Sequence, residues 1–160
     1  MAVEMEQVKA ALEPEEPDYP GAVKSLGAGA LPHLERIITG DQTGLAAKAA
    51  YLAGLIGTDK CVPAMNKAAA SGQPVVRLAA AAAARHLPDE YRDSLVLQLV
   101  DDADAGVQKV AMKSAPAMAV MSEALKSRVV ALGEAASKAP AVKQSAKKTA
   151  KKAAAKRKKP

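Results

Sequence analysis

The chain has 160 residues, 49% of them hydrophobic, with no Phe or Trp and three Tyr. This length suits one hydrophobic core with flanking segments, and the small apolar residues favour helices over sheets. The net charge of +6 conceals an acidic body and a strongly basic C-terminus. We therefore predict one all-α domain followed by a basic tail.

The N-terminus, MAVEMEQVKAALEPEEP, is acidic and lacks the basic start and apolar run of a secretory signal. No window approaches the roughly 18 uninterrupted apolar residues of a membrane span. The single cysteine, Cys61, excludes an intramolecular disulfide. We expect an intracellular protein without a membrane partner, either cytoplasmic or associated with nucleoid or chromatin.

Residues 1–17 are predicted to form an acidic capping helix over VEMEQVKAALE and then an extended, proline-rich linker. The next stretch, EPDYPGAVKSLGAG, fits poorly to the repeat that follows it. Terminal repeats are often atypical because their outer face meets water. We therefore assign it to a degenerate first unit.

A loose repeat organises residues 18–137. LPHLERIITGDQTGL begins at Leu31, and its counterpart VPAMNKAAASGQPVV begins at Val62, 62 − 31 = 31 residues later. Carried further, this step aligns apolar or small residues at i, i+4, i+7 and i+11, which lie on one face of a helix. The four columns are Leu45, Val76 and Val107; Ala49, Ala80 and Ala111; Leu52, Ala83 and Ser114; Ile56, Leu87 and Met118.

A second helix follows in each unit, over residues 62–70, 89–100 and 122–136. Its own stripe recurs as Leu34, Met65 and Val96, and as Ile38, Ala69 and Val100. A pair of short helices cannot enclose such stripes alone, so neighbouring pairs must stack and share a core. The predicted architecture is a right-handed α-solenoid of about four helix pairs.

Two stretches carry a family resemblance: GQPVVRLAAAAAARHL (residues 72–87) and DAGVQKVAMKSAPAM (residues 104–118). Each places an apolar residue and then Arg or Gln before an alanine-rich run. This pattern resembles the first helix of HEAT-like repeats, including the short variety of phycobilisome-lyase-like proteins. The resemblance covers residues 19–137 and implies a HEAT-like fold without indicating a function. Pro116 lies where it would kink its helix.

Residues 138–160 carry ten Lys or Arg and no Asp or Glu, which leaves 13 basic and 17 acidic residues in the rest of the chain. This Lys/Ala-rich tail is too polar to fold alone, and we predict disorder. Its composition resembles the tails of linker histones and bacterial histone-like proteins, which implies binding to DNA or RNA phosphates without sequence specificity. The candidate residues are Lys143, Lys147, Lys148, Lys151, Lys152, Lys156, Arg157, Lys158 and Lys159. Another acidic partner and a passive, solubilising tail remain alternatives.

Basic residues also recur in the predicted body. Arg36 and Lys67 are one repeat apart on the second helices, which commonly line the concave face of a solenoid. We hypothesise a basic ridge that assists the tail, and the alternative is a solvated face balanced by nearby carboxylates. The ridge would comprise Arg36, Lys67, Arg77, Arg85 and Arg92, and the balancing acids would be Glu35, Asp89, Glu90 and Asp93.

No pattern predicts catalysis. His33 and His86 have no partner at metal-ligand spacing, and Cys61 occupies a small, half-buried position in the repeat. The acidic run DDADAG (residues 101–106) lacks the spacing of a calcium loop, and we interpret it as a helix junction capped by Asp104. We expect no enzyme activity, metal, cofactor or small-molecule substrate.

The predicted function is a non-catalytic binding or scaffold protein. Its helical body would bind an unidentified protein partner, and its tail would bind DNA or RNA. The alternative is a pure protein adaptor whose tail is passive or docks an acidic partner.

Overall fold

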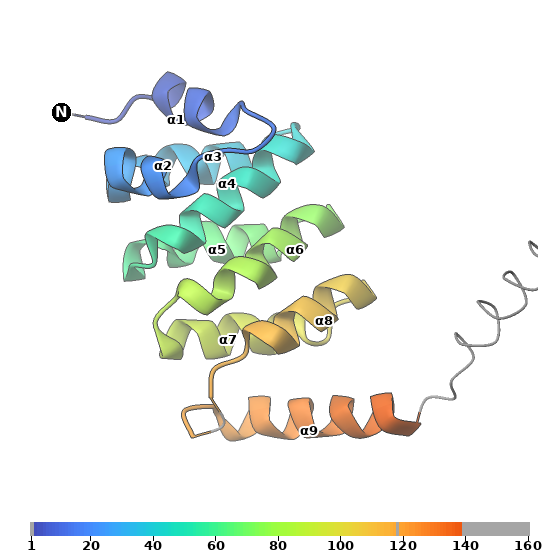
Figure 1. Ribbon diagram of the computed structural model, residues 1–160. Helices are drawn as coiled ribbons and strands as arrows, with labels where there is room; N and C mark the ends of the chain where they lie inside the picture. Colours follow the sequence, from blue (N-terminus) through green and yellow to red (C-terminus); the bar gives the residue numbers. More distant parts are fainter. Residues whose placement is uncertain (1, 118, 139–160) are drawn as a thin grey trace, which may run out of the picture. The chain divides into compact units, whose positions relative to one another are not determined.

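The computed structural model describes residues 2–117 and 119–138, and this part of the chain is all-helical, without a strand (Figure 1). The chain divides into two compact units, Met1–Val129 (unit 1) and Val130–Pro160 (unit 2). The boundary falls inside the last helix. The α-helices are α1 Met5–Leu12, α2 Tyr19–Leu26, α3 Leu31–Ile38, α4 Thr43–Ile56, α5 Val62–Ala69, α6 Pro74–Ala83, α7 Asp89–Leu99, α8 Ala105–Ser114 and α9 Glu123–Lys138.

The helix boundaries of unit 1 follow the repeat. Helices α4, α6 and α8 begin at equivalent positions, Thr43, Pro74 and Ala105. Helices α3 and α5 also begin at equivalent residues, and each has proline in its first turn, where no intrahelical N–H bond is lost. Helix α7 begins earlier than this register predicts, because Pro88 ends the preceding segment and is the N-cap residue of α7.

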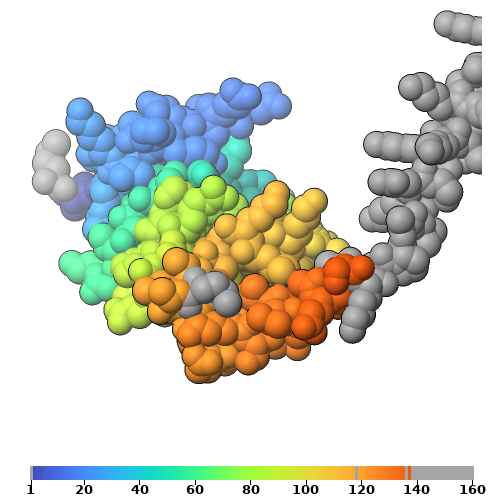
Figure 2. All heavy atoms as spheres, turned by 60° about the horizontal axis from the view of Figure 1, so that its bottom comes forward, coloured from blue at the N-terminus to red at the C-terminus, as the bar shows by residue number. Residues whose placement is uncertain are grey.

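Within unit 1 the helices pack in two rows (Figure 1). The first row is α2, α4, α6 and α8, each packed against the next. The second row is α3, α5 and α7, again in sequence, and α3–α4, α5–α6 and α7–α8 contacts join the rows. Short 3-10 helices at Gly27–Ala30 (η1), Asp59–Cys61 (η2) and Ala84–His86 (η3) connect successive helices. In the space-filling view, the segments of unit 1 cross the surface in chain order, from blue through green to yellow (Figure 2).

The core lies between the rows, where the repeat predicted it. Both columns of the second row are fully buried, and in the first row all described column residues are buried except Leu45 and Ile56, which are half-buried. Met118 lies outside the described residues. Helix α1 lies within the stretch predicted as an N-terminal helix, and it joins this core through Val8 and Leu12, both 0% exposed.

Local signals set the helix ends. Gly57 ends α4 in the left-handed conformation, with φ of 65°, which favours glycine. The Asp104 carboxylate accepts hydrogen bonds from the Gly106 and Val107 N–H groups, which confirms it as the cap of α8. One expectation was wrong: α8 ends at Ser114, so Pro116 follows the helix and does not kink it.

Candidate functional site

The nine basic residues predicted to bind nucleic acid, Lys143 to Lys159, lie outside the described residues. The structure therefore bears only on the other predicted surface, the basic ridge. Its five residues come from α3, α5, α6, η3 and α7.

Arg36 and Lys67 lie close together, as their spacing predicted. Both are exposed, and they border one depression of about 350 Å³ between α3 and α5. Lys67 forms an ion pair with Glu35, which borders the same depression. This part of the surface is therefore nearly charge-balanced, and Arg36 is its one cation without an ion pair within the described chain.

Arg77 does not belong to an exposed ridge, which corrects the sequence hypothesis. From the first turn of α6 its guanidinium donates two hydrogen bonds to Asp102, Nε to Oδ2 at 2.7 Å and Nη2 to Oδ1 at 2.9 Å. A third bond, from Nη1 to the Ser71 carbonyl, spans 2.8 Å. The Arg77 side chain is 14% exposed and that of Asp102 is 7% exposed. This bidentate pair is a structural clamp between α6 and the α7–α8 loop.

The clamp shifts the pKa of both partners. The hydrogen bonds from Arg77 lower the pKa of Asp102, against the opposing effect of burial. The same bonds raise the pKa of Arg77. Asp102 also accepts the Asp104 N–H at 2.8 Å, and its carbonyl accepts the Gln108 side-chain amide at 2.5 Å. The acidic run therefore positions the start of α8. The one hint of the clamp in the sequence was Arg77 itself, a single charged residue in an alanine-rich helix.

Arg85 and Arg92 meet where η3 joins α7. Arg92 pairs with Asp89 and donates from Nη1 to the Arg85 carbonyl at 3.2 Å. Arg85 is exposed. Three of the five predicted ridge residues thus have a carboxylate partner. Two of these partners, Glu35 and Asp89, are among the acids that the alternative of a balanced surface named. Of the other acids named there, Asp93 instead accepts the Ser122 N–H at 2.7 Å.

The cysteine and His33 both make hydrogen-bond contacts to backbone carbonyl groups. Cys61 is fully buried rather than half-buried, its thiol donates to the Thr58 carbonyl at 2.8 Å, and burial raises its pKa. His33 Nε2 lies 2.7 Å from the Val3 carbonyl oxygen, which ties the N-terminal segment to α3. Within residues 2–117 and 119–138, no cluster of three His, Cys, Asp or Glu side chains could hold a metal ion.

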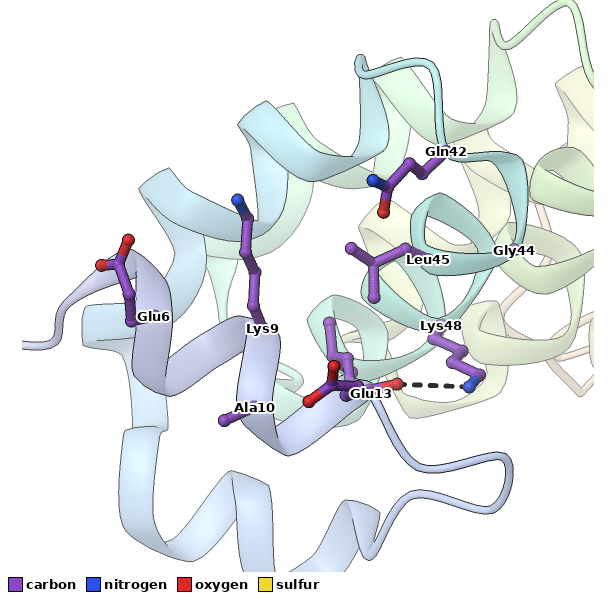
Figure 3. A pocket seen from close by; sticks show the side chains of 9 residues that line it. Glu6, Lys9, Ala10, Glu13, Gln42, Gly44, Leu45 and Lys48 are labelled. Atoms are coloured by element: carbon purple, nitrogen blue, oxygen red, sulfur yellow. Dashed lines mark hydrogen bonds between the residues drawn. The ribbon is translucent and has the colours of Figure 1, made fainter.

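A groove of about 570 Å³ lies between α1 and α4 (Figure 3). Lys48 Nζ donates to the Leu12 carbonyl at 3.2 Å and to the Pro14 carbonyl at 2.5 Å, which fastens the end of α1. Glu6, Lys9 and Glu13 also line this groove. Its mixed charges suit the docking of α1 and present no set of converging catalytic groups.

A further hollow, of about 280 Å³, lies on the outer side of the first row and is almost wholly apolar. It is lined by Tyr19, Tyr51, Val75, Leu78, three alanines and the Lys48 side chain, and we call it the apolar groove. The two tyrosine rings meet edge to face with centroids 5.0 Å apart. Sequence reasoning placed Val76, Ala80 and Ala83 of α6 in the core and made no prediction for the opposite side of the helix, where this groove lies.

The chain matches no protein-family model, no curated protein and no solved structure. None of the helices described is long and apolar enough to cross a membrane.

Proposed function

We propose that the protein is a non-catalytic scaffold whose helical body binds a protein partner and whose tail, residues 138–160, binds DNA or RNA without sequence specificity. The observation that carries this proposal is the separation of charge. The tail has ten basic and no acidic residues. In the body, by contrast, carboxylates form ion pairs with Lys67, Arg77, Arg92 and Arg128. The tail is thus the longest strongly basic stretch of the sequence that contains no acidic residue.

The proposed body is an α-solenoid of about four HEAT-like helix pairs: α2–α3, α4–α5, α6–α7, and α8 with the part of α9 that belongs to unit 1, residues 123–129. The equivalent starts of α4, α6 and α8 support it, as does the packing of each first-row helix against the next. In such an array each pair shares its core with its neighbours, and the two outer faces are left for binding. No reaction is assigned to these faces.

The tail would act through counterion release. Each phosphate that a lysine neutralises frees condensed cations, so affinity falls as salt rises. With about six phosphates contacted, the slope of log affinity against log salt is near −5. Lysines reach phosphates and do not read base edges, so unrelated duplexes should bind alike. Such binding would place the protein on nucleoid or chromatin.

The test is a salt titration of binding to unrelated duplex DNA and to RNA. It compares the full chain, a chain ending at Ser137, and a full-length chain in which every tail lysine and Arg157 are changed to glutamine, which keeps the length and removes the positive charge. We expect steep salt-dependent binding for the full chain alone. Equal binding by all three would instead assign the contact to exposed cations of the body, such as Arg36 and Arg85. No binding at physiological salt would reject the nucleic-acid role.

The apolar groove favours a second candidate, a pure protein adaptor. In that case removal of residues 143–160 leaves both protein contacts and nucleic-acid retention unchanged. Loss of nucleic-acid retention on the same truncation, with protein contacts intact, supports the scaffold instead.

A further inference from the structure

The apolar groove is open to solvent at the centre of the first row. Val75 is 46% exposed at its rim, and Tyr51 and Leu78 are half-buried on α4 and α6. Tyrosine is enriched in protein interfaces, and concave, mostly apolar surfaces are common binding sites.

No charged group of the described chain points into this centre. The only charged residue of α6 is Arg77, and its guanidinium is bound to Asp102 and Ser71. Lys48 borders the groove with its side chain, but its ammonium group donates to the Leu12 and Pro14 carbonyls. The aliphatic part of Lys48 can therefore cover apolar surface while its charge stays outside. An apolar partner surface can therefore pack into the apolar groove without burying an unpaired charge.

Charges of opposite sign flank the groove along the row. On the α2 side, the loop before Tyr19 is acidic, and its carboxylates are Glu13, Glu15, Glu16 and Asp18. All four residues are exposed, and none forms an ion pair with another described residue.

On the α8 side, the surface continues with lysines. One repeat after Leu78 and Ala82, the equivalent positions of α8 are Lys109 and Lys113, both exposed and without an ion pair in residues 2–117 and 119–138. The two lysines are one helical turn apart, and like charges at that spacing repel each other. An acidic partner surface would relieve this repulsion.

We propose that the first row is a self-association surface, on which a second copy of this chain docks through a two-fold axis lying between α4 and α6. Such an axis reverses the order of the helices, so α2 of one copy faces α8 of the other. The apolar grooves then meet at the centre, and the acidic loop of each copy faces Lys109 and Lys113 of its partner. Charge complementarity is satisfied twice in one symmetric interface.

This inference rests on residues of unit 1 and does not depend on the tail. If the tail does bind nucleic acid, a dimer presents two tails, and the second contact becomes intramolecular. A chain ending at Ser137 separates the two proposals, since it keeps the self-association surface and lacks the proposed nucleic-acid element.

The first test is the mass of the full chain in sedimentation from about 1 to about 200 µM, a range that covers micromolar dissociation constants. We expect twice the 16.4 kDa of one chain at the upper end. Val75→Glu should abolish the dimer. Val120→Glu is the matched control, because Val120 is 50% exposed outside the groove, and it should leave the dimer intact. Circular dichroism checks that both variants fold.

The second test exchanges charges. Glu15→Lys with Glu16→Lys forms one variant, and Lys109→Glu with Lys113→Glu forms the other; Asp18 is kept because it caps α2. In a dimer of either variant alone, the substituted residues face residues of like charge at both contacts, so most of the protein should become monomeric. An equimolar mixture of the two variants restores opposite charges and should form dimers again. A monomeric full chain, a dimer that survives Val75→Glu, or a mixture that does not associate would each overturn the proposal.

Discussion

The two rows of unit 1 expose different chemistry. The outer side of the first row is apolar around Val75 and Leu78, and its one arginine in α6 is turned into a clamp. The outer side of the second row carries Arg36, Lys67 and Gln98 at equivalent exposed positions, with Glu35 balancing Lys67. A positive charge that recurs at repeat spacing therefore does not by itself make a binding surface, because neighbouring carboxylates decide how much of that charge stays unpaired.

Since the clamp lies at the edge of the first row and is largely desolvated, its loss is the largest effect we predict. Asp102→Ala leaves the Arg77 guanidinium without its carboxylate and should lower the free energy of unfolding by about 3 kcal/mol, measured by urea denaturation. The double change Arg77→Met with Asp102→Leu is the control and should recover most of this loss. A loss below about 0.5 kcal/mol would place the clamp among ordinary surface pairs.

The clamp also predicts a pH dependence. The pKa of Asp102 is below its ordinary 3.8 in the folded protein, so its contribution is fully present above pH 3.8. The contribution is lost as the pH falls through the lowered pKa. The stability difference between wild type and Asp102→Ala should therefore be constant near neutral pH and shrink below pH 3.8, in urea titrations across this range.

The spacing within the first row depends on Gly54. A Cβ atom there would lie 2.4 Å from the Ala83 Cβ and 3.1 Å from the Ala83 carbonyl oxygen, so α4 and α6 would have to separate. Gly54→Ala should cost about 2 kcal/mol in thermal or urea unfolding. Gly44→Ala in the same helix meets nothing within 4 Å and should stabilise by about 0.5 kcal/mol through helix propensity. Equal effects at both sites would contradict close packing of the row.

Ser114 tests the core side of the first row. It occupies the column of Leu52 and Ala83, is 1% exposed, and its hydroxyl has no hydrogen-bond partner among the described residues. Ser114→Ala should raise the free energy of unfolding by about 1 kcal/mol, since it removes an unsatisfied buried group. Ser122→Ala is the control with the opposite sign, because the Ser122 hydroxyl accepts the Leu125 N–H at 3.2 Å in the first turn of α9.

The all-helical fold and most core columns could be predicted because stacking conserves residue size at fixed spacing. The six second-row positions from Leu34 to Val100 are buried as expected. The end of α8 was harder: the helical pattern continued to Pro116, and only the backbone restriction that a proline imposes on the preceding residue explains the stop at Ser114. The burial of Cys61 was underestimated because the sequence does not show how closely η2 and α5 pack.

The candidate site was harder to predict than the fold. Repeat spacing brought Arg36 and Lys67 together correctly but could not reveal that Arg77 turns toward Asp102, 25 residues away. The apolar groove was missed because α6 is apolar on almost every side, so its pattern does not distinguish core from surface. In a repeat protein, periodicity defines the side of a helix that neighbours cover and leaves the opposite side undefined.

The second row gives the smallest predicted effect. Lys67 is 50% exposed and Glu35 is 32% exposed, so water screens their ion pair and ordering two long side chains offsets its attraction. In a double-mutant cycle with Glu35→Gln and Lys67→Gln, the coupling in the free energy of unfolding should be below about 0.5 kcal/mol and should shrink further in high salt. The double substitution should leave binding to duplex DNA unchanged, because the two lost charges, both beside one depression, cancel. A coupling above about 1 kcal/mol would make this pair resemble the Arg77–Asp102 clamp and remove the contrast between the rows.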